Sequence, residues 1–101
     1  MKAYLIAPDN RRIEETTVDT LADIQALIGF DTLEIDQIGD SGDRLYFDEE
    51  CFLRGADGRF QIDSLIPVSG KGVITGPVDA GAVTADAVIG IDELRERIKY
   101  L

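Results

Sequence analysis

The sequence contains no histidine and only one cysteine, Cys51. Without histidine the chain cannot form Ser-His-Asp or Cys-His nucleophilic sites, and it lacks the imidazole ligands common in zinc, copper and iron centres. A single cysteine forms neither an internal disulfide nor a cysteine-based zinc site. We therefore assign no catalytic residue, no metal ligand and no cofactor from the sequence.

Long hydrophobic runs are also lacking. The apolar stretch near the start, residues 3–7, is only five residues long. A membrane-spanning helix needs about 20 apolar residues, and a secretion signal needs a longer apolar segment than this one. We expect a cytoplasmic protein that does not contact membranes.

Positive charge is scarce: 10 Lys and Arg residues face 20 Asp and Glu residues, which gives a net charge of −10. This balance favours solubility and opposes direct binding to nucleic acid or anionic membranes. Most of the charge is expected on a solvated surface, although an acidic surface can also mimic DNA toward a basic partner. The 101 residues, 45% of them hydrophobic, fit a single domain spanning residues 1–101.

The hydrophobic pattern predicts short strands and two helices. Alternating or compact apolar segments predict strands at residues 3–7, 12–18, 32–38, 44–48 and 73–75, and shorter apolar runs lie at 51–53 and 60–65. The Pro8-Asp9-Asn10 turn suggests that the first two strands form a hairpin. Residues 83–89 are ambiguous between a strand and an irregular connection. The fold class is α+β: a small, mainly antiparallel sheet with two short helices packed on it.

Helical periodicity supports helices at residues 20–28 and 91–99. Asp19 or Thr20 can cap the first helix, and Gly29 can end it in a left-handed turn. Its apolar stripe is expected to centre on Leu27. The full stripes are Leu21, Ile24, Leu27 and Ile28 in the first helix, and Ile91, Leu94 and Ile98 in the second.

Four segments together resemble a known family: MKAYLIAP at the start, GDRLYFDEE, PVSGKGVITG and the closing IDELRERI. The chain resembles small bacterial and phage-borne domains of unknown function along nearly its whole length. This resemblance implies a shared fold and an accessory role in a phage or another mobile element. It implies no activity, cofactor or catalytic residue. Cys51 stands where members of the family often have glycine.

The candidate ligand-binding residues are Gly70, Lys71 and Gly72. They do not form a nucleoside-triphosphate P-loop, because Leu65 and Gly72 occupy positions where that motif needs glycine and Ser or Thr. A glycine-rich turn can nevertheless direct backbone N–H groups at an anion, and Lys71 would supply the positive charge. The alternative is a tight turn carrying a solvated lysine.

Other chemistry-bearing residues have simpler interpretations. The run Asp48-Glu49-Glu50 could serve acid–base or divalent-cation chemistry, but neighbouring side chains on a strand diverge, so a charged strand end is favoured. Cys51 is expected to be a small buried hydrophobe. The acidic residues Asp36, Asp40 and Asp43 do not match a calcium loop and predict a turn. The residues Arg59, Phe60, Tyr46 and Phe47 could suggest a nucleic-acid platform, but core packing explains the aromatic side chains better.

These observations favour a non-enzymatic accessory domain that binds a protein or a small ligand. Two alternatives remain: an acidic DNA mimic that inhibits a nucleic-acid-binding protein, and a small enzyme that uses carboxylates. A mimic needs acidic residues clustered on one face, a ligand binder needs a pocket, and an enzyme needs a carboxylate with a shifted pKa inside that pocket. The oligomeric state does not follow from the sequence.

Overall fold

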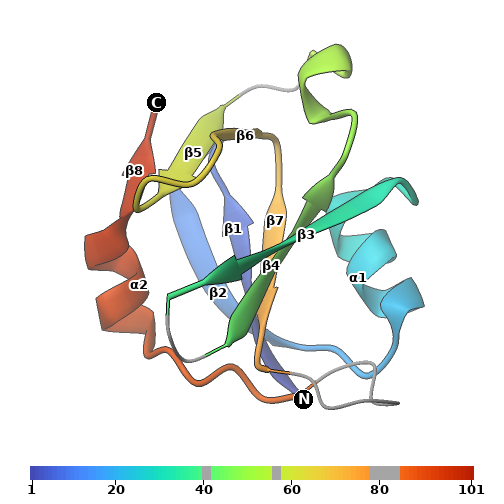
Figure 1. The fold of residues 1–101 in the computed structure, drawn as a ribbon. Coiled ribbons are helices and arrows are strands. Elements are labelled where there is room, and N and C mark those ends of the chain that lie inside the picture. The colour runs from blue at the N-terminus through green and yellow to red at the C-terminus, as the bar shows by residue number, and fades with distance from the viewer. Residues whose placement is uncertain (40–41, 56–57, 78–84) are drawn as a thin grey trace.

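The computed structural model describes residues 1–39, 42–55, 58–77 and 85–101, which form two antiparallel sheets and two short α-helices (Figure 1). In chain order the elements are β1 (Lys2–Ala7), β2 (Arg12–Thr17), α1 (Leu21–Ile28), β3 (Leu33–Ile38), β4 (Asp43–Asp48), the 3₁₀ turn η1 (Cys51–Leu53), β5 (Arg59–Ile62), β6 (Val68–Ser69), β7 (Gly72–Thr75), α2 (Ile91–Arg97) and β8 (Ile98–Tyr100).

The predicted α+β class is confirmed, with two sheets instead of one. The larger sheet has the strand order β2-β1-β7-β4-β3, and the smaller sheet has the order β6-β5-β8. The predicted β1–β2 hairpin is present, and Ile6 lies opposite Ile13. The chain passes from the smaller sheet to the larger one between β6 and β7, through Gly70 and Lys71.

Alternating side chains of the central strands fill two cores. Ala3, Tyr46 and Val73 belong to a core shared with α1, while Leu45 and its neighbours on the opposite face belong to a second core. As predicted, Leu45 and Phe47 lie on one face of their strand and Tyr46 on the other. The second core also contains side chains of the smaller sheet and of α2: Phe60, Ile62, Val68 and Leu94.

Helix α1 begins and ends as predicted, but its buried stripe is narrower. The Thr20 hydroxyl accepts a hydrogen bond from the backbone N–H of Asp23, and Gly29 ends the helix with φ 93°. Ile24 and Ile28 are buried. Leu27 was wrongly placed at the centre of the stripe: it is half-buried because it lies roughly 60° around the helix axis from Ile24. Leu21, in the first turn, is 44% exposed.

The second helix is shorter than predicted. It ends at Arg97, and the last predicted turn is the strand β8, in which Ile98 pairs with Ile62 and Tyr100 with Phe60. Backbone pairing with β5 therefore makes residues 98–100 a strand, although the apolar spacing of this segment also fitted a helix. The ambiguous segment 83–89 lies partly outside the described residues, and residues 85–89 form neither helix nor strand.

The aromatic side chains suspected of forming a nucleic-acid platform are buried, as core packing requires: Tyr46 is 3% exposed, Phe47 8% and Phe60 0%. Arg59 instead lies over the ring of Phe52. Across the described parts of the chain, no helix has the length and apolar character needed to cross a membrane.

Candidate functional site

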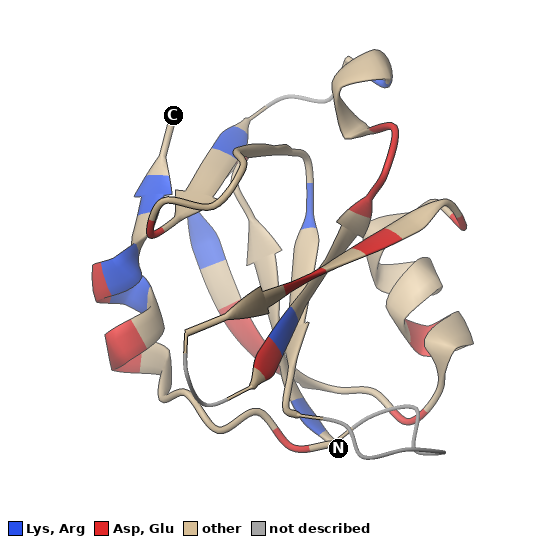
Figure 2. Cartoon of the chain, in the orientation of Figure 1, with Lys and Arg blue, Asp and Glu red and all other residues tan. Residues whose placement is uncertain are grey.

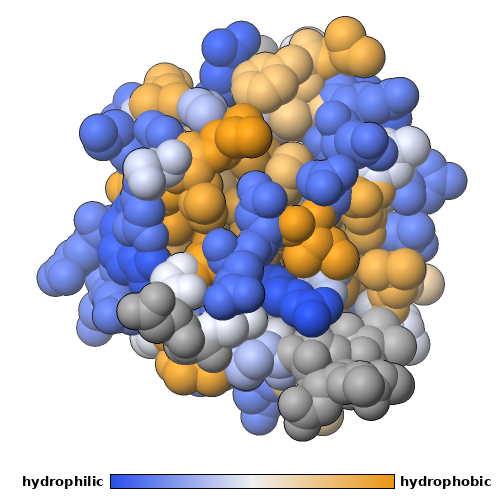
Figure 3. Space-filling model, viewed as in Figure 1, coloured by the Kyte–Doolittle hydropathy of each residue, from blue (hydrophilic) through white to orange (hydrophobic). Residues whose placement is uncertain are grey.

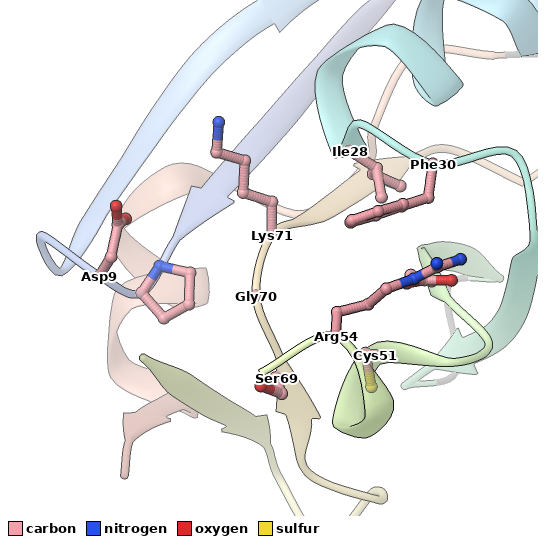
Figure 4. A pocket seen from close by; sticks show the side chains of 10 residues that line it. Asp9, Ile28, Phe30, Cys51, Arg54, Ser69, Gly70 and Lys71 are labelled. Atoms are coloured by element: carbon pink, nitrogen blue, oxygen red, sulfur yellow. The ribbon is translucent and has the colours of Figure 1, made fainter. Parts of the chain in front are cut away.

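A pocket of about 280 Å³ opens where the β1–β2 turn, the end of α1, η1 and the β6–β7 crossing meet (Figure 4). Figure 4 shows Asp9 on one side of Gly70, and Phe30 and Arg54 on the other. The lining residues are Pro8, Asp9, Ile28, Phe30, Asp48, Cys51, Arg54, Ser69, Gly70 and Lys71. The volume lies near the lower limit for small-molecule sites, which suits a ligand of metabolite size.

Two of the three candidate ligand residues, Gly70 and Lys71, line this pocket. Gly70 adopts φ 86°, a conformation that favours glycine, and its N–H donates to the Gly58 carbonyl at 3.1 Å. That N–H is therefore engaged within the protein. Lys71 forms no ion pair with any of the residues described here, so its ammonium group can meet a ligand.

Gly72 has a packing role. It belongs to β7, lies opposite Ile6 and Phe47, and is not among the residues that line the pocket. A Cβ atom at this position would lie 2.7 Å from Cζ of Phe60 and 3.0 Å from Cδ1 of Leu45. Glycine therefore lets the side chains of the second core close over the strand. Of the predicted turn, Gly70 and Lys71 remain the candidates for ligand contact.

Arg54 forms the wall opposite Asp9. Its guanidinium group lies 4.1 Å from the centre of the Phe30 ring and forms ion pairs with Asp48 at 2.9 Å and with Glu50 at 3.3 Å. These contacts order Phe30, which is partly exposed, beside the cavity. The pocket thus combines an aromatic wall with a cation that the protein already neutralises.

Asp48 ends β4, at the charged strand end that the sequence predicted, and its side chain is buried. One oxygen accepts hydrogen bonds from the Thr32 hydroxyl and the Glu50 N–H, and the other accepts from Nε of Arg54. Burial alone favours the neutral acid, but these hydrogen bonds and the positive charge of Arg54 outweigh it and hold the pKa of Asp48 below 3.8, its ordinary value. A carboxylate held in this way is a poor general acid.

We expect Asp48→Asn to lower the free energy of unfolding at pH 7 by about 1–2 kcal/mol, because it weakens charge-assisted hydrogen bonds. Since the folded-state pKa lies below the unfolded one, the stabilisation is complete above the unfolded pKa and is lost as pH falls through the folded pKa. The difference between wild type and variant should therefore shrink below about pH 4. Urea unfolding from pH 2.5 to 7 measures it, with Glu49→Gln as the exposed control. A pH-independent difference would contradict this account.

The remaining sequence candidates have structural roles or lie apart. Cys51 is 4% exposed at the inner side of the pocket, as the buried-hydrophobe prediction requires. Asp43 is fully buried, Asp36 lies on β3, and Asp40 lies outside the described residues. Within the described ranges, no group of three or more metal-binding side chains comes together.

Sequence reasoning missed Phe30, Arg54 and Asp9 as pocket residues. They lie on three different segments, and Phe30 directly follows the glycine that ends α1. Of the three, only Asp9 had been assigned a role, in the Pro8-Asp9-Asn10 turn. The ion pair between Arg54 and Asp48 spans six positions, so the charge run just before Cys51 was the one available signal.

A scan against protein-family models, a search of curated proteins and a search of solved structures found no match to this chain. The resemblance to small bacterial and phage-borne domains therefore stays a prediction.

Proposed function

We propose that this protein is a non-enzymatic binding domain whose pocket takes a small organic anion with an apolar or aromatic body. The observation that carries the proposal is the pocket itself: Lys71, which has no ion-pair partner among the described residues, and the Phe30 ring line the same cavity of about 280 Å³. Small-ligand sites typically combine apolar walls with a few polar groups that fix orientation.

The walls favour a ligand with one charged end. Ile28, Phe30 and Pro8 offer apolar surface, and Lys71 offers a cation at the β6–β7 crossing. Asp9 lies across Gly70 from Phe30, and its negative charge would repel a second negatively charged group of the ligand at that end of the pocket. A carboxylate attached to a flat apolar group meets both requirements.

The two alternative functions receive less support. Of the two carboxylates that line the pocket, Asp48 has a lowered pKa and both its oxygens accept hydrogen bonds, which makes it unsuited to acid–base catalysis. Figure 2 shows the acidic segments distributed over α1, α2, β2, β3 and the end of β4, whereas a DNA mimic needs them on one elongated face. A protein ligand remains compatible with the exposed apolar side chains of η1 and of the segment before β6, which are Phe52, Leu53 and Ile66. Figure 3 shows apolar surface near the top of the view, where η1 lies.

We also propose a biological context and a cell compartment for this binding role. The resemblance described above supports an accessory role in a phage or another mobile element. The single buried thiol of Cys51 suits the reducing cytoplasm, where disulfides are rare.

The experiment is titration with 2-naphthoate, monitored by amide NMR shifts, with acetate as a probe that has the charge but not the apolar body. We expect 2-naphthoate to shift the amides of Phe30, Gly70 and Lys71 and acetate to shift them far less. Lys71→Ala should weaken 2-naphthoate binding by about tenfold, because it removes the ionic partner of the ligand.

Lys2→Ala is the matched control, since it removes an exposed lysine that does not line the pocket. It should leave the affinity for 2-naphthoate within about twofold of wild type. Binding undiminished in Lys71→Ala, or equally weakened in both variants, would show that the β6–β7 crossing does not hold the anion.

A further inference from the structure

A second cavity lies on the other side of the β1–β2 turn. It is a groove of about 450 Å³ between the start of β2, the end of α2 and β8. Helix α2 packs against β2, which brings together residues from the two ends of the sequence. The six lining residues include no acidic side chain: Arg11, Arg12, Ile13, Arg95, Ile98 and Tyr100.

This groove gathers positive charge in an acidic protein. Three of the 10 basic residues of the chain line it, and Figure 2 shows the basic segments of α2, β8 and the start of β2 in the same region. The ion pairs made here are solvent-exposed: Arg12 with Glu14 and Arg95 with Asp92. Exposed pairs are weak, so a multivalent anion can replace the carboxylates as partner. Arg97 belongs to a different contact, its ion pair with Asp63.

Tyr100 connects the arginines to a less polar surface. Burial raises the pKa of the Tyr100 phenol, and the positive charges of Arg95 and Arg11 oppose that rise. Both guanidinium groups therefore act on the same phenol from different elements, one from α2 and the other from the β1–β2 turn. Ile13 and Ile98 complete the surface. The groove thus offers the N–H donors of three arginines beside an aromatic ring and two aliphatic side chains.

We propose that this groove is a binding site for a diphosphate group, either as free pyrophosphate or as part of a nucleoside diphosphate. Arginine presents planar, paired N–H donors that match phosphate oxygens, and three such groups suit a ligand carrying two or more negative charges. This ligand class differs from the singly charged organic anion proposed for the Lys71 pocket, and the two sites share no lining residue.

Arg11 permits a variant that separates binding from folding. Its φ of 54° is left-handed, a conformation that asparagine adopts more readily than arginine. Arg11→Asn should therefore keep or slightly raise the thermal midpoint and yet remove one guanidinium from the groove. Arg95 is exposed on α2, and Arg95→Gln removes one positive charge from the α2 side of the groove.

The test is calorimetric titration of the protein with pyrophosphate and with ADP at constant ionic strength. We expect pyrophosphate and ADP to bind the wild-type protein. Arg11→Asn and Arg95→Gln should each weaken pyrophosphate binding by about tenfold, because each removes a charge-assisted hydrogen bond. Tighter binding of ADP than of pyrophosphate would assign the site to a nucleoside diphosphate; equal binding would assign it to the diphosphate alone.

Arg59→Gln and Lys2→Ala are the controls, because each removes one positive charge that lies outside the groove and outside the Lys71 pocket. Both should bind pyrophosphate within about twofold of wild type. The proposal is overturned if neither ligand binds the wild type at 10 mM, roughly the weakest affinity of functional interest. It is equally overturned if Arg59→Gln weakens binding as much as the groove variants do, since that would show only general charge attraction.

Discussion

Gly76→Ala is expected to destabilise the protein by about 3 kcal/mol or more, which for a domain of this size lowers the thermal midpoint by at least about 10 °C. A Cβ atom at Gly76 would overlap the carbonyl oxygen of Asp86, and that oxygen belongs to the backbone and cannot rotate away. The Gly76 N–H also donates to the Ala85 carbonyl at 2.8 Å. The new methyl group would therefore push residues 85–86 away from the end of β7.

Gly90→Ala is the matched control for this prediction. A Cβ atom at Gly90 would meet no atom within 4 Å, and the backbone there has φ −79°, which alanine adopts without strain. We expect its stability to stay within about 0.5 kcal/mol of wild type. Thermal unfolding followed by circular dichroism measures both variants. Equal midpoints would mean that the close approach of Asp86 to Gly76 is absent in solution.

Asp43→Ala is expected to cost about 3 kcal/mol, because a fully buried carboxylate accepts two backbone hydrogen bonds there. The N–H of Val88 donates to Oδ1 at 3.0 Å and the N–H of Ile89 to Oδ2 at 2.8 Å. These bonds hold the segment before α2 against β4 and place the buried Ile89 in the second core. Alanine would leave two N–H groups without acceptors.

Asp43→Asn distinguishes hydrogen bonding from packing, since it keeps the volume of the side chain and replaces one acceptor oxygen with a donor. We expect it to be destabilised as well, by about 1–2 kcal/mol. Glu15→Ala, an exposed carboxylate on β2, should change stability by no more than about 0.5 kcal/mol. Urea unfolding at pH 7 provides the comparison. An Asp43→Asn variant as stable as wild type would assign the role of Asp43 to packing.

The sequence predicted correctly those features of the fold that are specified by residues close together in the chain. The Thr20 cap and the Gly29 end of α1 lie within one helix, and the alternation of Leu45, Tyr46 and Phe47 lies within one strand. Strand β8 was missed because Ile98 continues the helical spacing of α2, and its pairing with Ile62 involves a residue far away in the sequence. Periodicity within a segment carries no information about such a partner.

The sites were less predictable for the same reason. Lys71 stood out because a lone cation beside two glycines is conspicuous in an acidic sequence. The groove was not predicted because Arg11 and Arg95, on the β1–β2 turn and α2, come together only after the chain has folded. Asp43 was read as a turn residue because its two hydrogen-bond donors come from the segment before α2.

The strand order has a consequence for the folding rate. The centre of the larger sheet joins β1 to β7, with Tyr4 opposite Ile74, and the Tyr4 hydroxyl also donates a hydrogen bond to the Ile89 carbonyl late in the chain. Closing such long loops costs chain entropy before the contacts compensate for it, so topologies of this kind fold slowly for their size. Early in folding, the β1–β2 and β3–β4 hairpins can form from nearby residues, but they remain separate until β7 enters between them.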